Sequence, residues 1–349
     1  MAAIRFGRQP AAELQAPERR PDPICTSLGR TAGAGDYGRA EFFEVRFGPS
    51  VSSGTDPHCI AVPLHTIDGH ERVESWSGTA ATANESIDGI CAVTSNDHVV
   101  LHARIPACAA DGITAATAAL YGNLIGRARS LGYPQLLRTW NFVPDINRGD
   151  GDGETYVRFS RGRAVALDRL GVAPTCYPAA TAVGALPGSP LLVIVLASRS
   201  EPLTIENPRQ MSAYLYPRKY GPRSPAFARA TLLRHSDGGT LFISGTASIV
   251  GHESRHDEFG AQLAETVTNL EQLLAVAEQR APDLAVTTQR SWRVYLRHAG
   301  DAALAESAIT DRLGSRQQLL LLQADICRRE LLVEIEGVCT LAARAPEGA

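Results

Sequence analysis

Two glutamates lie two residues apart near the end of the chain, in the segment LLVEIEGV at 331–338. Alternation of side chains predicts a strand over 331–341, with Glu334 and Glu336 on one face. The strand predicted over 318–327 is apolar on both faces, so we expect the sheet to be covered. Burial raises the pKa of a carboxyl group, and a glutamate that stays protonated at neutral pH can act as a general acid. The alternative is a solvated strand face.

Cys327 lies seven residues before Glu334, across the connection between these two predicted strands. If the strands form a tight hairpin, the thiol comes close to the carboxyl group. The alternative is a small packing residue at the end of a strand.

A basic loop rich in tyrosine and proline, YLYPRKYGPRSPAFARA, spans residues 214–230. It presents Arg223 and Arg229 together with Tyr216 and Tyr220. A guanidinium group binds a carboxylate through two parallel hydrogen bonds, so such a loop suits an anionic ligand. A solvated basic loop is the other interpretation.

The elements that must position these residues follow one order twice. Apolar periodicity predicts strand, helix, strand, helix and strand in each half. The expected segments are 98–105, 112–131, 135–143, 155–170 and 191–197, then 240–250, 258–279, 292–298, 301–313, 318–327 and 331–341. We therefore expect an α+β fold in which mixed sheets pack against helices. Its predicted parts are an N-terminal arm over 1–25, an N-terminal α+β domain over 26–200 and a C-terminal domain over 201–349.

Composition narrows the class of ligand. The 349 residues include 34 basic and 37 acidic side chains, a net charge of −3, which favours neither nucleic acid nor an anionic membrane. No GxGxxG follows a strand, no GxxxxGK[ST] is present, and no GxSxG marks a serine nucleophile.

Seven cysteines without CxxC spacing argue against a disulfide framework or a zinc site and fit a reducing cytoplasm. His252 and His256 could form a helical metal pair, but a loop entering the next helix is the simpler interpretation.

Several segments resemble the chorismatase family. The matching stretches are WNFVPDIN (140–147), FSRGRA (159–164), the loop at 214–230, FISGTASIVGHES (242–254), YLRH (295–298) and LLVEIEG (331–337). The last stretch is also similar to the C-terminal strand of the RidA/YjgF family, whose fold the chorismatases share. The resemblance implies two RidA/YjgF-like (chorismate-mutase-like) halves and places Glu334 at the catalytic position of that family.

The resemblance also implies a substrate, chorismate, which carries two carboxylates and therefore needs two cationic anchors. It points first to Arg229 and Arg297, and next to Arg163. Further substrate contacts are implied for Tyr216, Tyr220, Arg223, Gly245 and Thr246, the glycine because backbone without a Cβ can approach a ligand closely.

By the same resemblance, neutral Glu334 protonates the methylene carbon of the enolpyruvyl ether, and pyruvate leaves. A cysteine at position 327 is typical of the branch that makes 3-hydroxybenzoate, by attack of the 4-hydroxyl group and an arene oxide. No metal or redox cofactor is required, and we expect a cytoplasmic enzyme.

Four alternatives stay open. Two are other chorismatase outcomes: hydrolysis to a trans-dihydroxycyclohexadiene carboxylate, and mixed 3- and 4-hydroxybenzoate. The others are a RidA-like imine deaminase, for which the chain is about three times too long, and a non-catalytic aromatic-acid binder. The protein is expected to be a monomer or a RidA-like trimer. The sequence does not identify the role of residues 1–95 or the pathway served.

Overall fold

Three large β-sheets, a two-stranded ribbon and four α-helices make up the regular structure of the described residues. The computed structural model describes residues 23–29, 40–52, 54–78, 81, 83–106, 112–313 and 318–344. The expected N-terminal arm lies outside these residues except for its last three. None of the described helices is long and apolar enough to cross a membrane.

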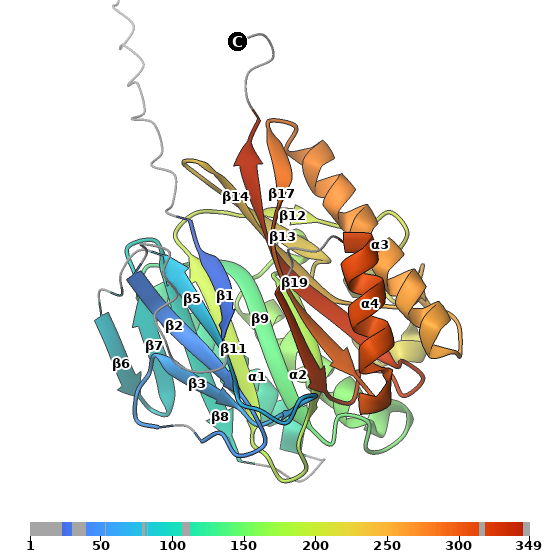
Figure 1. Ribbon diagram of the computed structural model, residues 1–349. Helices are drawn as coiled ribbons and strands as arrows, with labels where there is room; N and C mark the ends of the chain where they lie inside the picture. The colour runs from blue at the N-terminus through green and yellow to red at the C-terminus, as the bar shows by residue number, and fades with distance from the viewer. Residues whose placement is uncertain are drawn as a thin grey trace, which may run out of the picture.

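The first half of the chain forms a six-stranded sheet covered on one face by two helices (Figure 1). Its order is β10 (Ala179–Ala185), β9 (Gln135–Pro144), β11 (Leu191–Ser198), β8 (His98–Ile105), β7 (Ile90–Thr94) and β6 (Ala83–Ile87). Helices α1 (Ile113–Ser130) and α2 (Thr155–Arg169) pack on it through apolar side chains from both layers. Because β9 and β10 run parallel, α2 serves as the crossover between them.

The second half forms a seven-stranded sheet under α3 (Phe259–Arg280) and α4 (Ala302–Leu313). Its order is β12 (Leu203–Ile205), β13 (Ala230–His235), β14 (Gly238–Ala247), β19 (Val333–Ala343), β17 (Leu284–Leu296), β18 (Gln318–Gln323) and β4 (His65–Thr66). β17 and β18 are parallel, so α4 connects them. A two-stranded ribbon, β15 (Ile249–Val250) and β16 (Glu253–Ser254), follows β14.

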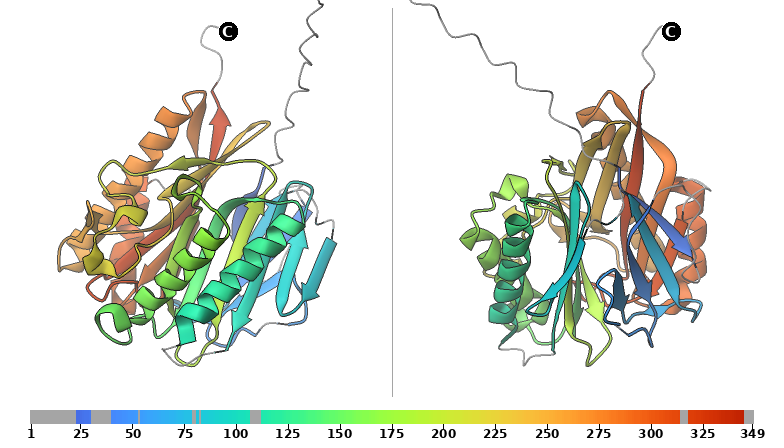
Figure 2. Two further views of the ribbon diagram at one scale, coloured as in Figure 1. Left: turned by 180° about the vertical axis from the view of Figure 1, so that it is seen from behind. Right: turned by 90° about the vertical axis from the view of Figure 1, so that its left-hand side faces the viewer.

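A third, four-stranded sheet comes from the N-terminal segment. Its order is β1 (Cys25–Gly29), β5 (Arg72–Gly78), β2 (Ala40–Phe47) and β3 (Cys59–Val62). In Figure 2, right, the two helical layers lie on opposite outer sides, with the sheets between them.

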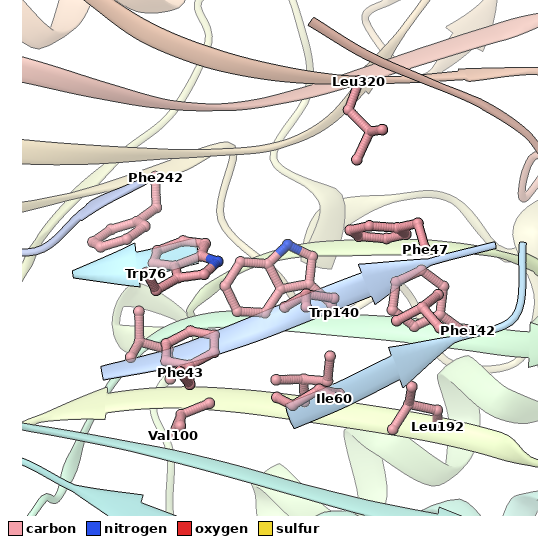
Figure 3. Packing of buried hydrophobic residues seen from close by; sticks show 14 of the residues in the cluster. Phe43, Phe47, Ile60, Trp76, Val100, Trp140, Phe142, Leu192, Phe242 and Leu320 are labelled. Carbon is pink, nitrogen blue, oxygen red and sulfur yellow. The ribbon is translucent and has the colours of Figure 1, made fainter. Parts of the chain in front are cut away.

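The three sheets share one aromatic core (Figure 3). Trp76 of β5 stacks on Phe43 of β2, with ring centroids 5.1 Å apart. The Trp76 ring also makes an edge-to-face contact with Trp140 of β9, with centroids 5.4 Å apart, and is stacked with Phe242 of β14 at 6.4 Å. The N-terminal sheet is therefore an integral part of the interior that joins the two halves.

The predicted α+β fold, with mixed sheets packed against helices, is confirmed, and so are the four helices and the order of both halves. Strands β10, β12, β13 and β16 were missed, and the strands β1 to β7 before residue 98 were not predicted individually. The last two predicted strands do not form the tight hairpin that was considered as a way to bring Cys327 close to Glu334, because β17 lies between β18 and β19. The domain boundary near residue 200 stays a prediction; β4, from the first half, joins the sheet of the second.

Candidate active site

A cavity of about 370 Å³ opens where the C-terminal end of β14 meets the start of β19. Its walls come from the N-terminal turn of α2, the loop before β13, the end of β14 and the connection from β18 to β19. The lining side chains include Tyr156, Lys219, Tyr216, Tyr220, Phe227, Arg229, Gly245, Cys327, Arg328, Arg329, Glu330 and Glu334. Segments of both halves thus build one site.

Glu334 is the buried carboxyl group of this cavity, with 4% of its surface exposed. Burial raises its pKa to about 8, and the neighbouring carboxylate of Glu336 acts in the same direction. Arg138, a hydrogen bond from Cys327 and Arg229 oppose this rise. At neutral pH the group is therefore mostly in its acid form.

Gly245 provides the wall against which Glu334 lies. The register of β14 and β19 shifts between Ile243 and Thr246, and this irregularity presents the Gly245 backbone to the carboxyl group. A Cβ atom on Gly245 would stand 2.0 Å from Oε1 of Glu334. Glycine is therefore required for the observed position of the acid.

Cys327 reaches Glu334 from a loop rather than from a hairpin. Residues 324–332 run across the ends of the strands, and the amide of Gly184 on β10 holds their start by donating to the Asp325 carbonyl at 2.7 Å. This loop brings Sγ of Cys327 to 3.9 Å from Oε2 of Glu334. Burial and the nearby Glu334 raise the pKa of the thiol to about 12, so it stays protonated.

Tyr156 was missed by sequence reasoning, although it lies in the predicted helix at 155–170. It lines the cavity at the first turn of α2. Burial raises the pKa of its phenol above the ordinary range, and the adjacent Cys327 adds to that rise. Its place at the start of a helix that follows the matched WNFVPDIN segment was a usable signal.

Arg229 is the buried cation of the cavity, with 2% of its surface exposed. Its Nη2 donates to the Tyr216 hydroxyl at 2.7 Å and to the Met211 carbonyl at 2.8 Å. Among the described residues its Nε has no hydrogen-bond partner. The ring of Phe227 lies 5.2 Å from the guanidinium carbon. One buried N–H donor of Arg229 is thus left without a partner within the described structure.

Arg328 is a second cation that sequence reasoning missed. Its guanidinium carbon lies 4.0 Å from the Tyr220 ring centroid and 5.3 Å from that of Tyr216. Nη1 donates to the His252 carbonyl and to Oγ of Ser254, each at 3.0 Å. It directly follows Cys327, and this adjacency was the available signal.

Arg297 does not line the cavity, contrary to the expectation from the YLRH motif. All five of its N–H groups are engaged. Nε donates to the Leu331 carbonyl, Nη1 to the side chains of Asn147 and Asp325, and Nη2 to the Ile326 and Arg328 carbonyls. The side chain thus holds the 324–332 loop in place.

Three further expected contacts also lie elsewhere. Arg163 is buried behind the cavity wall, its guanidinium carbon 5.8 Å from the Phe227 ring, and within the described structure its Nε and Nη2 lack partners. Arg223 is exposed and pairs with Asp168. Thr246 donates its hydroxyl hydrogen to the Ser244 carbonyl and is buried outside the cavity. By contrast Glu334, Cys327, Arg229, Tyr216, Tyr220 and Gly245 all meet at the cavity.

The histidine pair considered for a metal is split. The ring of His252 lies against Tyr220, with centroids 5.7 Å apart, whereas Nε2 of His256 faces Glu265 at 3.5 Å. Over the described ranges, no group of three or more His, Cys, Asp and Glu side chains is arranged to hold a metal ion.

The chain resembles proteins of one family along most of its length. The N-terminal model of FkbO/Hyg5-like chorismatases matches residues 74–197. A chorismatase of Streptomyces rapamycinicus is 36% identical over 290 residues, which cover 80% of this chain and 86% of that protein. A 3-hydroxybenzoate synthase of Streptomyces hygroscopicus is 34% identical over 275 residues, covering 76% and 80%.

A solved chorismatase structure supports the same family. A chorismatase crystal structure superposes with a TM-score of 0.81 at 34% identity, covering 91% of this chain and 98% of that one. RidA of Psychrobacter sp. PAMC 21119 also aligns, with a TM-score of 0.28 at 18% identity, covering 39% and 98%. From the sequence identity, the coverage and the shared fold, the chain belongs to the chorismatase family of enzymes.

Proposed function

We propose that this enzyme converts chorismate to 3-hydroxybenzoate and pyruvate, with Glu334 as general acid. The observation that carries the proposal is a buried carboxyl group with a pKa of about 8 in a cavity that also holds a buried arginine. Relatives named chorismatase and 3-hydroxybenzoate synthase support the substrate and the product.

Chorismate suits the size and charge of the cavity. A volume of about 370 Å³ falls within the range of small-molecule sites. The buried Arg229 is the proposed anchor for one carboxylate, and Arg328 for the other. Tyr216 and Tyr220 form the walls beside these two cations.

The first step is protonation of the enol ether. Glu334 donates its proton to the methylene carbon, and the side chain becomes an oxocarbenium-like centre. The bond between C3 and the ether oxygen then breaks, with its electron pair leaving on pyruvate. General acid help of this kind contributes about 10²–10⁴-fold to the rate.

The second step sets the product. The substrate's 4-hydroxyl oxygen attacks C3 and loses its proton, which balances the proton given by Glu334. The resulting arene oxide opens at C4 and loses the C3 hydrogen to give 3-hydroxybenzoate. Cys327, a neutral thiol 3.9 Å from Glu334, is the proposed proton relay for ring opening. Without that relay, attack by water would give the diene diol.

The substitution Glu334→Gln tests the acid. It keeps the shape of the side chain but removes its transferable proton, so we expect pyruvate release to fall by at least about 10²-fold. Pyruvate is followed with a lactate dehydrogenase couple, and chorismate binding by calorimetry should persist. Glu306→Gln, on the exposed face of α4, is the matched control. A wild-type protein that binds chorismate but releases no pyruvate would instead be an aromatic-acid binder.

The substitution Cys327→Ala tests the product. We expect pyruvate release to continue while chromatography shows a shift from 3-hydroxybenzoate toward the diene diol. Cys176→Ala, at an exposed cysteine, is the control. An unchanged product mixture would remove Cys327 from the branch-deciding role.

A further inference from the structure

Four buried charged side chains form a group that begins beside Glu334 and lies outside the residues that line its cavity: Glu74, Arg138, Arg293 and Glu336. None exposes more than 5% of its surface. They come from β5, β9, β17 and β19, so all three sheets contribute. The chemistry proposed above does not use them.

The four side chains form one hydrogen-bonded cluster. Glu336 accepts from Nη2 of Arg138 at 2.6 Å through Oε2, and from Nη1 of Arg293 at 3.0 Å through Oε1. Nε1 of Trp140 also donates to Oε1, at 2.9 Å. Arg293 continues to Glu74, its Nε donating to Oε2 at 2.8 Å. The two positive and two negative charges balance within the interior.

This cluster reaches Glu334 in two ways. Glu334 and Glu336 lie on the same face of β19, opposite Tyr295 and Arg293 of β17. In addition, Nη2 of Arg138 donates to Oγ1 of Thr181 at 2.5 Å, and that oxygen accepts the Gly245 amide at 2.9 Å. Gly245 is the wall against Oε1 of Glu334.

We propose that Glu336, Arg138 and Thr181 are positioning residues for Glu334. The charge of Glu336 adds to the effect of burial in favouring the acid form of Glu334, and the Arg138–Thr181–Gly245 chain fixes the backbone against which Glu334 lies. Arg138 and Arg293 both donate hydrogen bonds to the Glu336 carboxylate and fix its position. The inference rests on the proposed function only for its kinetic measurement.

Among the described residues that act on Glu334, Glu336 is the one whose charge opposes the ionisation of its carboxyl group. Arg229 and Arg138 favour ionisation of Glu334, and a raised pKa keeps Cys327 neutral. Strands β14 and β10 present no titratable side chain to it. Within the described structure, the charged or titratable groups near Glu334 are Glu336 from β19, Tyr295 from β17, Arg138 from β9, Arg229 from the segment before β13, Cys327 from the 324–332 loop and Tyr156 from α2. The cavity is also lined by Asp152, Glu154, Lys219, Arg328, Arg329 and Glu330.

The proposal is tested by measuring kcat/KM for chorismate as a function of pH in the wild type and in variants. Because Glu334 works as an acid, kcat/KM should fall as pH rises through its pKa. Glu336→Gln removes the facing negative charge and should move this fall to lower pH by about one unit or more. Glu336→Asp retains the charge and should stay near the wild-type profile. Glu74→Gln removes a carboxylate from the far end of the same cluster and should leave the profile in place, whatever its effect on stability.

A second measurement needs no substrate. The infrared carbonyl band of the protonated Glu334 carboxyl, assigned by its loss in Glu334→Gln, should disappear at lower pH in Glu336→Gln than in the wild type. If the wild type releases no pyruvate, the proposed function fails and this band still tests the inference. Identical pH dependence of both signals in wild type and Glu336→Gln would overturn the role of Glu336.

Two further variants complete the test. Should Glu336→Gln not yield folded protein, Arg138→Gln probes the opposite sign, and its profile should move to higher pH; an unmoved profile would count against the proposal. Thr181→Val removes the acceptor of the Gly245 amide without changing charge, so turnover should drop about tenfold at every pH. A wild-type rate in Thr181→Val would exclude Thr181 from the assignment.

Discussion

At the scale of single residues, the surroundings of Glu334 disfavour the ionised form of its carboxyl group. Glu334 lies on a covered sheet face beside Glu336, and burial in that position raises its pKa to about 8. An unperturbed glutamic acid is ionised well below neutral pH. The function proposed for Glu334 therefore depends on its surroundings rather than on its residue type.

The raised pKa has a cost in stability that can be measured. Its ordinary pKa is 4.5, so the folded protein holds a proton that the unfolded chain releases between pH 4.5 and about 8. The stabilisation from this proton is complete below pH 4.5 and is lost as pH rises through 8. Glu334→Gln, which has no proton to lose, should therefore gain stability relative to wild type over that range, by roughly 3 kcal/mol at pH 7.

Urea unfolding of both proteins from pH 5 to pH 9 checks this expectation, with Glu306→Gln as the exposed counterpart. A stability difference that is the same at every pH would show that Glu334 is ionised in the folded protein.

At the scale of elements, one arginine arranges the loop that carries the thiol. Arg297, just after β17, binds side chains and carbonyls along the 324–332 loop with all five of its N–H groups. Its place within the matched YLRH motif suggested a ligand contact. The number of donors already engaged is a property of the folded loop, which spacing along the chain does not reveal.

Arg297→Met should loosen this loop while leaving the strands intact. We expect faster hydrogen exchange across 324–332 and a turnover about ten- to a hundredfold lower, since small displacements of reacting groups are costly. Arg312→Met is the matched control, because Arg312 also makes several hydrogen bonds, between α4 and α3, away from the cavity. Unchanged exchange in the 324–332 loop would contradict the assigned role.

The sequence predicted the positions of helices and strands along the chain better than it predicted which strands lie side by side. Periodicity located α1 to α4 within about a residue or two, because each buries one apolar face. It could not show that β17 separates β18 from β19, since strand order depends on contacts distant in the chain. Glu334, with its alternating strand and covered surroundings, could be identified, whereas Arg328 and Tyr156 become site residues only through the path of a loop and the start of a helix.

At the scale of the whole molecule, three sheets share one interior. Trp76 of the N-terminal sheet contacts Phe43, Trp140 and Phe242, which belong to all three. The cluster of Glu74, Arg293, Glu336 and Arg138 crosses the same interior. The N-terminal segment, whose role the sequence left open, therefore contributes Trp76 to the shared core and Glu74 to the buried charge cluster.

Trp76→Ala should destabilise the entire protein by about 3–5 kcal/mol, because it removes a fully buried ring from the shared core. Chemical denaturation should show one cooperative transition at lower denaturant. Ile87→Ala, at an exposed position, should change stability by less than about 0.5 kcal/mol. Loss of the N-terminal sheet alone, with the other two sheets unaffected, would argue against a shared core.

The strand order has a consequence for how such enzymes diversify. Glu334 belongs to a central strand, whereas Cys327 comes from a surface connection, and β17 keeps the two strands flanking that connection apart. Under the proposed mechanism, the release of pyruvate depends on Glu334 in the sheet, whereas the product formed from the ring depends on Cys327 in the connection. Descendants of one ancestor can therefore exchange the thiol, and with it their end product, while inheriting the same proton donor unchanged.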